Sequence, residues 1–299
     1  MTSDTIFKSG YIAIVGRPNV GKSTLMNCLV GERLSIVTPK PQTTRTRVLG
    51  IASGEGYQMI FLDTPGLLDP KYPLQEAMVK TIKAAVDDAD LVLLLVDARG
   101  DAKPDLDQLL PWVRKKSLVV GINKIDLVQK EALLPLISGI AERASRAEIV
   151  PFSALTRFSV EELRKVLLRL LPAGSPFYPE DQFTEHPERF FAAELIREQV
   201  FLTTGDEIPY STAVLIEEFK ERTAEGGKKD FIRATIYVEK ENQKAILIGK
   251  DGRGLKRIGS RARTAIESLT GRPVYLELWV KVKPGWRKSR RDLQELGYL

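Results

Sequence analysis

The sequence predicts two domains of different fold class: an α/β domain built on a mostly parallel sheet, followed by a smaller α+β domain. Residues 10–171 alternate short apolar runs with amphipathic stretches, a pattern typical of parallel strands covered by helices. A proline-rich segment ends this pattern, and the order of elements then changes to helix, strand, strand, helix, helix, strand. A chain of 299 residues is long enough for both domains. We place the first domain at residues 1–172, a linker at 173–182 and the second domain at 183–299.

The apolar runs of the first domain have the length and composition of strands buried on both faces. They are Tyr11–Val15, Gln58–Leu62, Leu91–Val96, Leu118–Ile122 and Ile149–Phe152. The helical patterns between and after them are Leu74–Asp88, Asp105–Lys115, Lys130–Ala144 and Val160–Leu171. The longest strongly apolar run stops at Asp97, far short of the roughly 20 residues of a membrane span. The amino terminus has no apolar core of signal-peptide length, so we expect a cytoplasmic protein.

The segment Pro172–Gln182 contains three prolines and a glycine, which predicts an interdomain linker. The second domain then opens with a helical pattern at Pro187–Thr204. Strands follow at Ala213–Phe219 and Phe231–Val238, and the second of them alternates apolar and polar residues. After two more helices, a last strand carries apolar side chains on one face, at Val274, Leu276, Leu278, Val280 and Val282.

Basic residues are concentrated at the carboxyl end. Residues 228–299 carry 18 Lys and Arg against 8 Asp and Glu, a net charge of +10, which leaves −4 for residues 1–227 of a chain whose total is +6. This distribution indicates a polyanionic partner for the second domain, although a merely solvated basic face would give the same count. The single cysteine, Cys28, and the single histidine, His186, exclude a disulfide framework and a Cys/His zinc cluster within the chain.

Residues 16–23 read GRPNVGKS, the phosphate-loop pattern GxxxxGK[ST], between a predicted strand and a predicted helix. The glycines allow backbone N–H groups to converge on phosphates, and the helix amino terminus adds positive potential. Lys22 is expected to reach the β- and γ-phosphate oxygens, and the Ser23 hydroxyl is expected to bind Mg²⁺. The expected nucleotide contacts of this loop are Gly16, Arg17, Pro18, Asn19, Val20, Gly21, Lys22, Ser23 and Thr24.

Residues 63–66 read DTPG at the end of another predicted strand and add Asp63, Thr64, Pro65 and Gly66 to the expected nucleotide contacts. A carboxylate at Asp63 can hold Mg²⁺ through water, and the Gly66 N–H can bond the γ-phosphate and lose that partner on hydrolysis. The alternative is an ordinary strand-ending Pro-Gly turn. The polar segment 39–47, PKPQTTRTR, should supply a threonine that completes the Mg²⁺ sphere; Thr43 and Thr44 are both candidates, and Thr44 is favoured.

Residues 123–126 read NKID, again at the end of a predicted strand. The Asp126 carboxylate can accept both N1–H and N2–H of guanine, which adenine does not offer, while the Lys124 stem can lie along the base. Residues 153–155, SAL, follow the next strand and can direct the Ala154 N–H to guanine O6. The location of these motifs at the carboxyl ends of strands makes them specific. The expected base contacts are Asn123, Lys124, Asp126, Ser153, Ala154 and Leu155.

The second domain contains a GxxG loop between two predicted helices, and its order of elements resembles a type II KH domain. In a KH domain this loop lets the backbone of a single-stranded nucleic acid approach closely. The alternative is a plain helix-connecting turn in a domain that binds a protein. The expected RNA contacts are Ile248, Gly249, Lys250, Asp251, Gly252, Arg253, Lys256, Arg257 and Arg261, with Arg263 on the same basic helix.

The motifs of the first domain resemble the translation-factor-like class of P-loop GTPases, with one informative departure from Ras-like members. Leu67 follows DTPG where a Ras-like protein has a glutamine that orients water, and an apolar side chain cannot do this. In this class an asparagine at Asn19 is associated with a K⁺ ion that takes the place of an arginine finger, while a turn-forming residue after Pro18 is the alternative. The resemblance thus implies that hydrolysis depends on Lys22, Asn19, Thr44 and Gly66.

One such GTPase domain followed by one KH domain closely resembles the Era family of bacterial ribosome-assembly GTPases, over essentially the whole chain. The resemblance implies GTP/GDP and Mg²⁺ as cofactors, with K⁺ as a further one. It also implies binding to the 3′ end of 16S rRNA during maturation of the 30S ribosomal subunit, under the control of the nucleotide state, with no DNA partner.

Two other interpretations remain open from the residues. One is a GTP-dependent scaffold whose basic domain docks on a protein or on an anionic membrane, which would place the protein peripherally at the inner membrane. The other is a DNA-binding KH protein, because the residues do not decide between RNA and DNA. The GxxG loop disfavours the scaffold, since protein docking has no need of a close approach to a glycine backbone.

Overall fold

The structure, a computed structural model, describes residues 6–113, 116–205, 207–222, 226 and 228–299. The chain divides into two compact units. The first comprises the chain up to Pro70 together with Met78–Glu185, and the second comprises Lys71–Ala77 and His186–Leu299. The division near residue 186 lies slightly beyond the predicted start of the second domain at residue 183. We describe each unit by itself.

The described residues of the first unit form one six-stranded sheet in the order β2-β3-β1-β4-β5-β6. All neighbouring strands are parallel except β2 and β3. The five predicted runs lie in strands, except that Ile149–Phe152 extends one residue beyond β6, and β2 is the strand that the apolar pattern missed. The bounds are β1 Lys8–Gly16, β2 Val48–Gly54, β3 Tyr57–Asp63, β4 Leu91–Asp97, β5 Ser117–Asn123 and β6 Glu148–Pro151.

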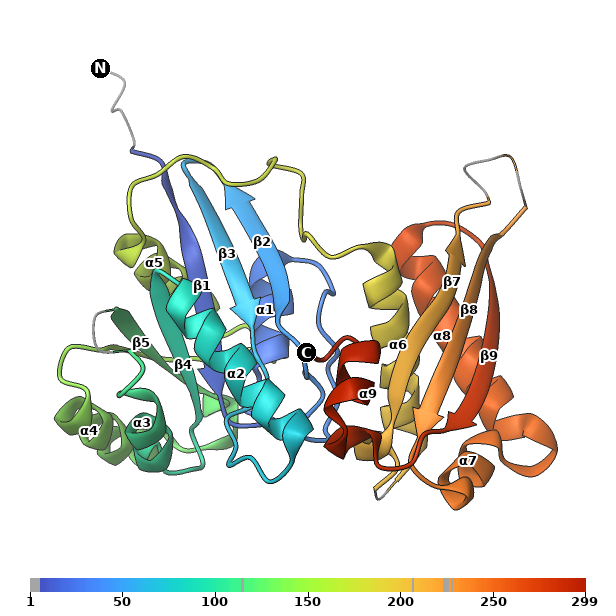
Figure 1. Ribbon diagram of the computed structural model, residues 1–299. Coiled ribbons are helices and arrows are strands. Elements are labelled where there is room, and N and C mark those ends of the chain that lie inside the picture. The colour runs from blue at the N-terminus through green and yellow to red at the C-terminus, as the bar shows by residue number, and fades with distance from the viewer. Residues whose placement is uncertain (1–5, 114–115, 206, 223–225, 227) are drawn as a thin grey trace. The chain divides into compact units, whose positions relative to one another are not determined.

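Helices cover both faces of this sheet, with α2, α3 and α4 in front of it and α1 and α5 behind it in Figure 1. Two predicted helices are shorter than their patterns. The predicted Asp105–Lys115 helix ends at Leu109, and residues 114–115 lie outside the described residues. The predicted Lys130–Ala144 helix starts with a 3₁₀ turn, because Pro135 is best accommodated in a first α-helical turn. The bounds are α1 Lys22–Val30, α2 Pro73–Asp88, α3 Lys103–Leu109, α4 Leu133–Arg143 and α5 Val160–Leu170, with 3₁₀ turns η1 Ile125–Leu127 and η2 Lys130–Ala132.

The predicted linker is not a free connection over its first half. Its backbone follows β1, where Ser9 N donates to Pro172 O at 3.2 Å and Gly174 N donates to Phe7 O at 3.0 Å. Further along, the Gln58 side chain accepts the N–H of Phe177 at 2.7 Å and of Tyr178 at 3.0 Å. Proline prevents regular secondary structure here, but the hydrogen bonds attach this segment to the first unit.

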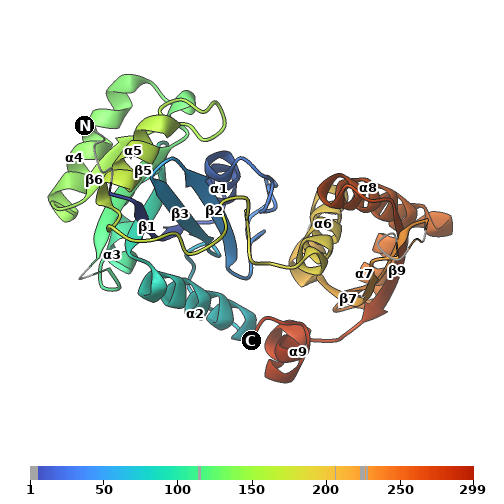
Figure 2. The ribbon, with the colours of Figure 1, turned by 90° about the horizontal axis from the view of Figure 1, so that it is seen from above.

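The second unit contains a three-stranded sheet in the order β7-β8-β9, with β7 antiparallel and β9 parallel to β8. The order α6-β7-β8-α7-α8-β9 is the one predicted, and α9 follows. In Figure 2, α6 and α8 lie on the same side of this sheet. The bounds are α6 Glu188–Thr203, β7 Ala213–Lys220, β8 Asp230–Val238, α7 Glu241–Ile248, α8 Arg253–Thr270, β9 Val274–Val282 and α9 Arg290–Glu295, with 3₁₀ turns η3 Pro209–Ser211, η4 Lys250–Gly252 and η5 Trp286–Lys288.

Alternation along the strands separates a core face from an outer face in the second unit, although Phe231 and Thr235 on the outer face of β8 are also buried. The even-numbered residues of β8, from Ile232 to Val238, are fully buried against α6, α7 and α8. The even-numbered residues of β9 pack on the same core, as predicted. Leu269 is 39% exposed, because α8 is close to its end there. The odd-numbered residues of both strands therefore form the outer face of the sheet.

Candidate functional site

The loop between β1 and α1 follows the phosphate-loop pattern, and its backbone is fixed from outside by Asn123. The Asn123 Nδ2 donates to Val20 O at 2.8 Å. Gly21 has a φ of +103°, and a Cβ there would lie 2.3 Å from the same Nδ2 atom. Any larger residue at Gly21 would thus push the loop away from the end of β5. The loop opens on a pocket of about 340 Å³, which Lys22 and Ser23 line.

Lys22 is buried under this loop and points along it. Its Nζ donates to Gly16 O and Arg17 O, each at 2.9 Å. Burial lowers the pKa of Lys22 to about 8, while the nearby carboxylates of Asp63 and Asp105 act in the opposite direction. The ammonium is held by neutral carbonyl groups within the loop, where it can exchange them for phosphate oxygens at small cost in reorganisation.

The side-chain oxygens of Ser23, Thr44 and Asp63 come from distant segments and lie close together. Ser23 Oγ donates to Asp63 Oδ2 at 2.8 Å and lies 3.2 Å from Thr44 Oγ1. Thr44 is buried, and its hydroxyl lies 3.4 Å from the same carboxylate oxygen. This geometry supports Thr44 over Thr43 as the threonine of the polar segment. Ser35, which the sequence analysis did not single out, also donates to Asp63 Oδ2 at 2.9 Å.

The cluster fits Mg²⁺ by its chemistry, since hard oxygen donors are the ligands that this ion prefers. Among the described residues, Asp63 Oδ1 is buried and has no hydrogen-bond partner. Burial raises the pKa of Asp63, against the effect of Lys22 and the three hydroxyl groups. A divalent cation would compensate for both the burial and the unpaired oxygen. Ser23, Thr44 and Asp63 are the residues that would hold it, directly or through water.

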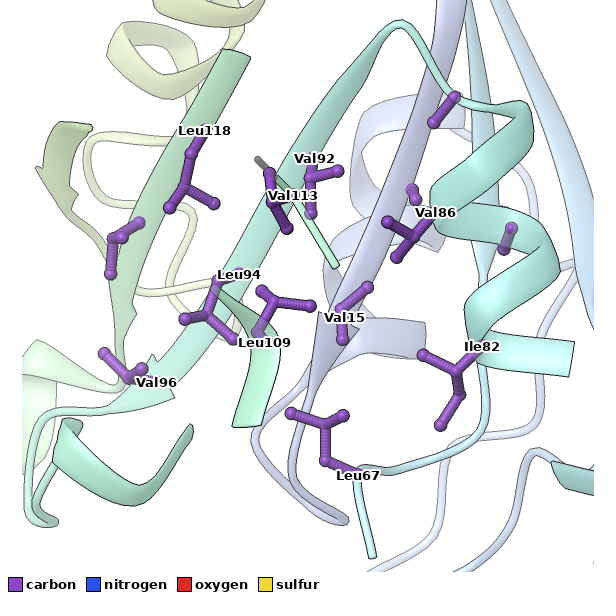
Figure 3. Close-up of a cluster of buried hydrophobic side chains, with 14 of the residues drawn as sticks. Val15, Leu67, Ile82, Val86, Val92, Leu94, Val96, Leu109, Val113 and Leu118 are labelled. Carbon is purple, nitrogen blue, oxygen red and sulfur yellow. The ribbon is translucent and has the colours of Figure 1, made fainter. Parts of the chain in front are cut away.

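The position after DTPG is part of the core. Leu67 is 4% exposed and packs beside Val15 and Ile82 in the apolar cluster of Figure 3. Its side chain therefore points away from the phosphate pocket. Asn19, in contrast, lines that pocket and donates from Nδ2 to Pro39 O at 2.8 Å. Its φ of +62° agrees with turn formation, and its amide also connects the phosphate loop to the polar segment.

The remaining DTPG residues support the loop. The Thr64 hydroxyl is buried and donates to Ile14 O at 2.7 Å, which holds the turn against β1. Leu67 N donates to Gly16 O at 2.9 Å, and Gly66 lines the pocket beside Pro18. The predicted γ-phosphate donor, Gly66, is thus placed at the phosphate loop.

The base-reading motifs meet at the carboxyl ends of β5 and β6. Asp126 is exposed in η1, and Leu155 is 79% exposed in the SAL loop. Ala154 differs from expectation, because its N–H donates to Asn123 Oδ1 at 2.9 Å. It must share or release that partner to reach guanine O6. Asn123 therefore supports both the phosphate loop and the SAL loop.

Sequence analysis missed Asp97 and Arg99, which follow directly from β4. Asp97 accepts the Lys124 ammonium at 2.8 Å and two hydrogen bonds from Arg99, at 2.9 and 2.8 Å. The Arg99 hydrogen bond, with a smaller contribution from Lys124, holds the pKa of Asp97 well below its usual range against partial burial. A carboxylate at the carboxyl end of a parallel strand was a usable signal, because ligands bind at this edge of such sheets.

The GxxG loop of the second unit forms a tight, exposed turn between α7 and α8. Gly249 and Gly252 have φ of +70° and +73°, and the side chains of Lys250 and Asp251 point into solvent. A Cβ on Gly252 would meet nothing within 4 Å, so the space beside this glycine is open. The backbone of an extended ligand can therefore approach the loop closely.

A groove of about 540 Å³ runs from this loop between α8 and β9. The helix and the strand lie close together at Gly259 of α8, where an added Cβ would be 3.3 Å from the Leu278 side chain of β9. Three of the predicted cations of α8, Arg253, Arg257 and Arg261, are exposed but are not among the groove-lining residues, because they lie on another side of the helix. The lining is Lys229, Gly252, Leu255, Lys256, Gly259, Ser260, Arg263, Val274, Tyr275, Leu276 and Leu278.

Comparison with known families agrees with this division. Residues 11–124 match the family described as 50S ribosome-binding GTPase, and residues 207–287 match the KH domain family. The fold and the phosphate-loop site thus define a P-loop GTPase that carries a carboxyl-terminal KH domain.

Whole-chain relatives identify the family. The chain is 46% identical to GTPase Era of Syntrophus aciditrophicus over 98% of its length and 96% of the relative's. It is 48% identical to GTPase Era of Geotalea uraniireducens, with 98% of each chain covered. Our chain belongs to the Era family of GTPases.

Two solved structures have the same fold, each with a TM-score of 0.93 and 44% identity over 98% of this chain and 99% of the other. One is Aquifex aeolicus Era bound to GDP and AlF4⁻. The other is Era in complex with MgGDPNP and nucleotides 1506–1542 of 16S ribosomal RNA. In the part of the chain that the structure describes, no helix is both long and apolar enough to cross a membrane.

Proposed function

We propose that this GTPase is a molecular switch that binds the 3′ end of 16S rRNA through its KH domain and acts in assembly of the 30S ribosomal subunit in the cytoplasm. The observation that supports this most directly is the meeting of Ser23, Thr44 and Asp63 beside Lys22, in a chain that also carries an open GxxG groove. The solved relative with 16S rRNA, at 44% identity over nearly the full chain, supports the choice of RNA.

The nucleotide site performs its part by positioning and by charge. Lys22 replaces its carbonyl partners with phosphate oxygens, and the glycine-rich loop offers its N–H groups to the same phosphates. Mg²⁺, when bound, neutralises negative charge on the β- and γ-phosphates. Thr44 comes from the polar segment 39–47, so the presence of a γ-phosphate determines whether this segment stays in place. Hydrolysis of GTP should therefore change the position of the polar segment 39–47.

Water activation does not involve a side chain after DTPG, because Leu67 is in the core. Among the polar groups that line the pocket, which also include Gln42 and Thr43, are the backbone at Gly66 and the Asn19 amide. We propose that they position the attacking water, with K⁺ adding positive charge next to Asn19.

The test combines hydrolysis and binding on the full chain. Purified protein should convert GTP to GDP and phosphate in Mg²⁺, and ATP should not compete. It should also bind a single-stranded RNA of the 16S 3′-terminal sequence more tightly than the DNA of the same sequence, because groove contacts include the 2′-hydroxyl groups. Equal affinity for RNA and DNA would remove the rRNA assignment. Binding to anionic vesicles in preference to RNA would instead favour the scaffold that docks peripherally at the inner membrane.

A further inference from the structure

The outer face of the sheet in the second unit carries exposed aromatic rings. Tyr275 and Trp279 on β9 are 58% and 53% exposed, although both are large and partly apolar. They lie on this face because the alternate residues of β9 pack on the core. Exposed aromatic residues on a folded surface are typical of binding sites, since their area is stabilising only when it is covered.

Tyr275 belongs both to this face and to the groove. It lines the groove together with Lys229 and Lys256, and β9 is the outermost strand in the order β7-β8-β9. The groove surface is therefore continuous, around the edge of β9, with the outer face. A strand of nucleic acid that leaves the groove past Tyr275 next meets the row of odd-numbered residues that leads to Trp279.

Both rings are held in place by their neighbours. The Tyr275 ring stacks on Phe231 at 5.9 Å between centroids and 13° between planes, and the Arg222 guanidinium lies 4.8 Å from the Phe231 ring. Trp279 Nε1 donates to Glu277 Oε1 at 2.8 Å. Fixed rings lose little conformational entropy when a base stacks on them.

The acidic residues of this face are neutralised by partners. Glu277 lies 3.3 Å from Arg233, and Glu217 lies 3.2 Å from Lys281. Glu218 is paired with Arg233 at 3.1 Å and also with a lysine of β7. The carboxylates therefore do not give the face a negative potential that would repel an approaching phosphate backbone.

We propose that Tyr275 and Trp279 form a stacking shelf for unpaired RNA bases that flank the bases held in the groove. The proposal rests on the proposed RNA-binding function. Four residues of extended strand separate the two positions by about 13 Å along β9, more than the ~3.4 Å between neighbouring stacked nucleotides, so the two rings serve different nucleotides. A KH groove clamps about four nucleotides. The RNA in the complex of the solved relative runs from nucleotide 1506 to 1542, which is much longer than a groove of this kind can hold.

The experiment compares two single-stranded RNAs from the 16S 3′ terminus on the full-length protein. One has about four nucleotides and fills only the groove, and the other extends it by several nucleotides on both sides. Trp279→Ala and Tyr275→Ala should each weaken binding of the longer RNA at least about fivefold, since loss of one base–aromatic stack has that effect. None of the Trp279 variants should alter binding of the shorter RNA, because Trp279 does not line the groove. Trp279→Phe should bind the longer RNA like the parent, and Trp279→Leu should resemble Trp279→Ala.

Fluorescence gives a second readout. Of the three tryptophans, Trp286 is fully buried and Trp112 belongs to the first unit, so quenching by RNA should come from Trp279. Quenching should be strong with the longer RNA, weak with the shorter one, and absent in Trp279→Phe although that variant still binds.

The possible failures are distinct. If the parent binds both RNAs and the alanine variants bind the longer one equally well, the shelf is wrong and the RNA-binding function stands. If Leu restores binding as well as Phe, the face is a plain apolar contact, as for a protein partner, and the shelf is again wrong. If the parent binds neither RNA, the proposed function itself is lost.

Discussion

The ammonium of Lys124 lies 2.8 Å from the Asp97 carboxylate. The same ammonium donates to Asn19 O at 2.6 Å, so one side chain connects the end of β4 with the phosphate loop. The connection follows from sheet register, because Asp97 pairs with Asn123 in the parallel β4–β5 ladder and Lys124 is the next residue. The lysine of the guanine-reading motif is thus held at its tip by groups outside that motif.

This geometry predicts that Asp97→Asn weakens nucleotide binding by about 1 kcal/mol, roughly fivefold, the scale of one partly exposed charged pair. GDP and IDP should weaken by the same factor, because we expect the Lys124 stem to lie along the base and not to read its 2-amino group. Titration of both nucleotides by fluorescence or calorimetry measures this.

The control is Arg99→Ala, which removes the other partner of the same carboxylate and leaves the bond to Lys124 in place. It should bind GDP nearly like the parent. A double-mutant cycle with Lys124→Ala completes the test. If Asp97→Asn costs as much in that background as in the parent, Asp97 does not act through Lys124.

A second prediction concerns base choice. Asp126 is exposed in η1, and we expect its carboxylate to be available to guanine N1–H and N2–H. Asp126→Asn should weaken GTP by roughly 2–4 kcal/mol and should favour xanthosine triphosphate, whose base presents an acceptor at that position. Competition between the two nucleotides gives the ratio. A variant with unchanged GTP affinity would show that Asp126 does not read guanine.

The parts of this protein that sequence could predict are local. The five buried runs could be predicted as strands because mostly apolar runs of strand length are typical of a sheet covered on both faces, and the motifs at their ends are recognised by their spacing. The strand β2 was not predicted because Gly50, Gly54 and small residues weaken its apolar pattern. It forms because a tight turn at Gly56 folds it back onto β3.

The parts that sequence could not predict are relations between distant residues. The bonds from Asp97 to Lys124 and from Ser35 to Asp63 depend on sheet register and on the path of a loop. Likewise, nothing in the sequence distinguishes the basic residues of α8 that line the groove from those that do not. Only the position of β9 distinguishes Lys256 and Arg263, which line the groove, from the cations on the other side of the helix.

Salt dependence should separate these two sets of cations. Lys256→Ala or Arg263→Ala should each reduce the slope of log affinity for RNA against log salt by about 0.7, the value for one phosphate contact on a single strand. Arg257→Ala and Arg261→Ala are matched controls on the same helix and should leave the slope nearly unchanged, since neither lines the groove. If all four variants lower the slope equally, the RNA is held by the general charge of the helix and not by the groove.

The location of Leu67 in the core predicts a cation effect on hydrolysis. Turnover of GTP should rise when Na⁺ is replaced by K⁺, and Asn19→Ala should abolish the difference between the two salts. Because Asn19 also donates to Pro39 O, the variant should be compared at saturating GTP, so that altered binding does not enter the rate. Equal rates of the parent in Na⁺ and K⁺ would leave Asn19 as a turn residue that supports the polar segment. Lys22→Ala should abolish tight nucleotide binding in either salt.

The last prediction tests whether the two units work as one switch. Lys250 is exposed in the GxxG loop, and its neighbour Asp251 is already acidic. Lys250→Asp should therefore repel an RNA backbone while both flanking helices remain intact, and RNA affinity should fall. GTP affinity and basal hydrolysis should stay near those of the parent, because the substitution is in the other unit. Lys250→Ala is the matched control that removes the cation without adding an acid, and its loss should be smaller.

Coupling between nucleotide binding and RNA binding gives a stricter test of the switch. RNA affinity should differ between the states bound to GDP and to a non-hydrolysable GTP analogue, by about 1–3 kcal/mol, and RNA should change the affinity for the two nucleotides by the same factor. We expect the tighter RNA complex with the GTP analogue, because a γ-phosphate and Mg²⁺ should keep Thr44 beside Ser23 and Asp63, where the structure places it. Thr44→Ala should reduce the difference in RNA affinity between the two nucleotide states, because it removes the group that is expected to distinguish them.

The measurement is one RNA titration in each nucleotide state for the parent, Lys250→Asp and Thr44→Ala. Superimposable curves for the parent in both states would mean that the chain carries two independent binding modules, and the proposal of a nucleotide-controlled RNA switch would have to be abandoned.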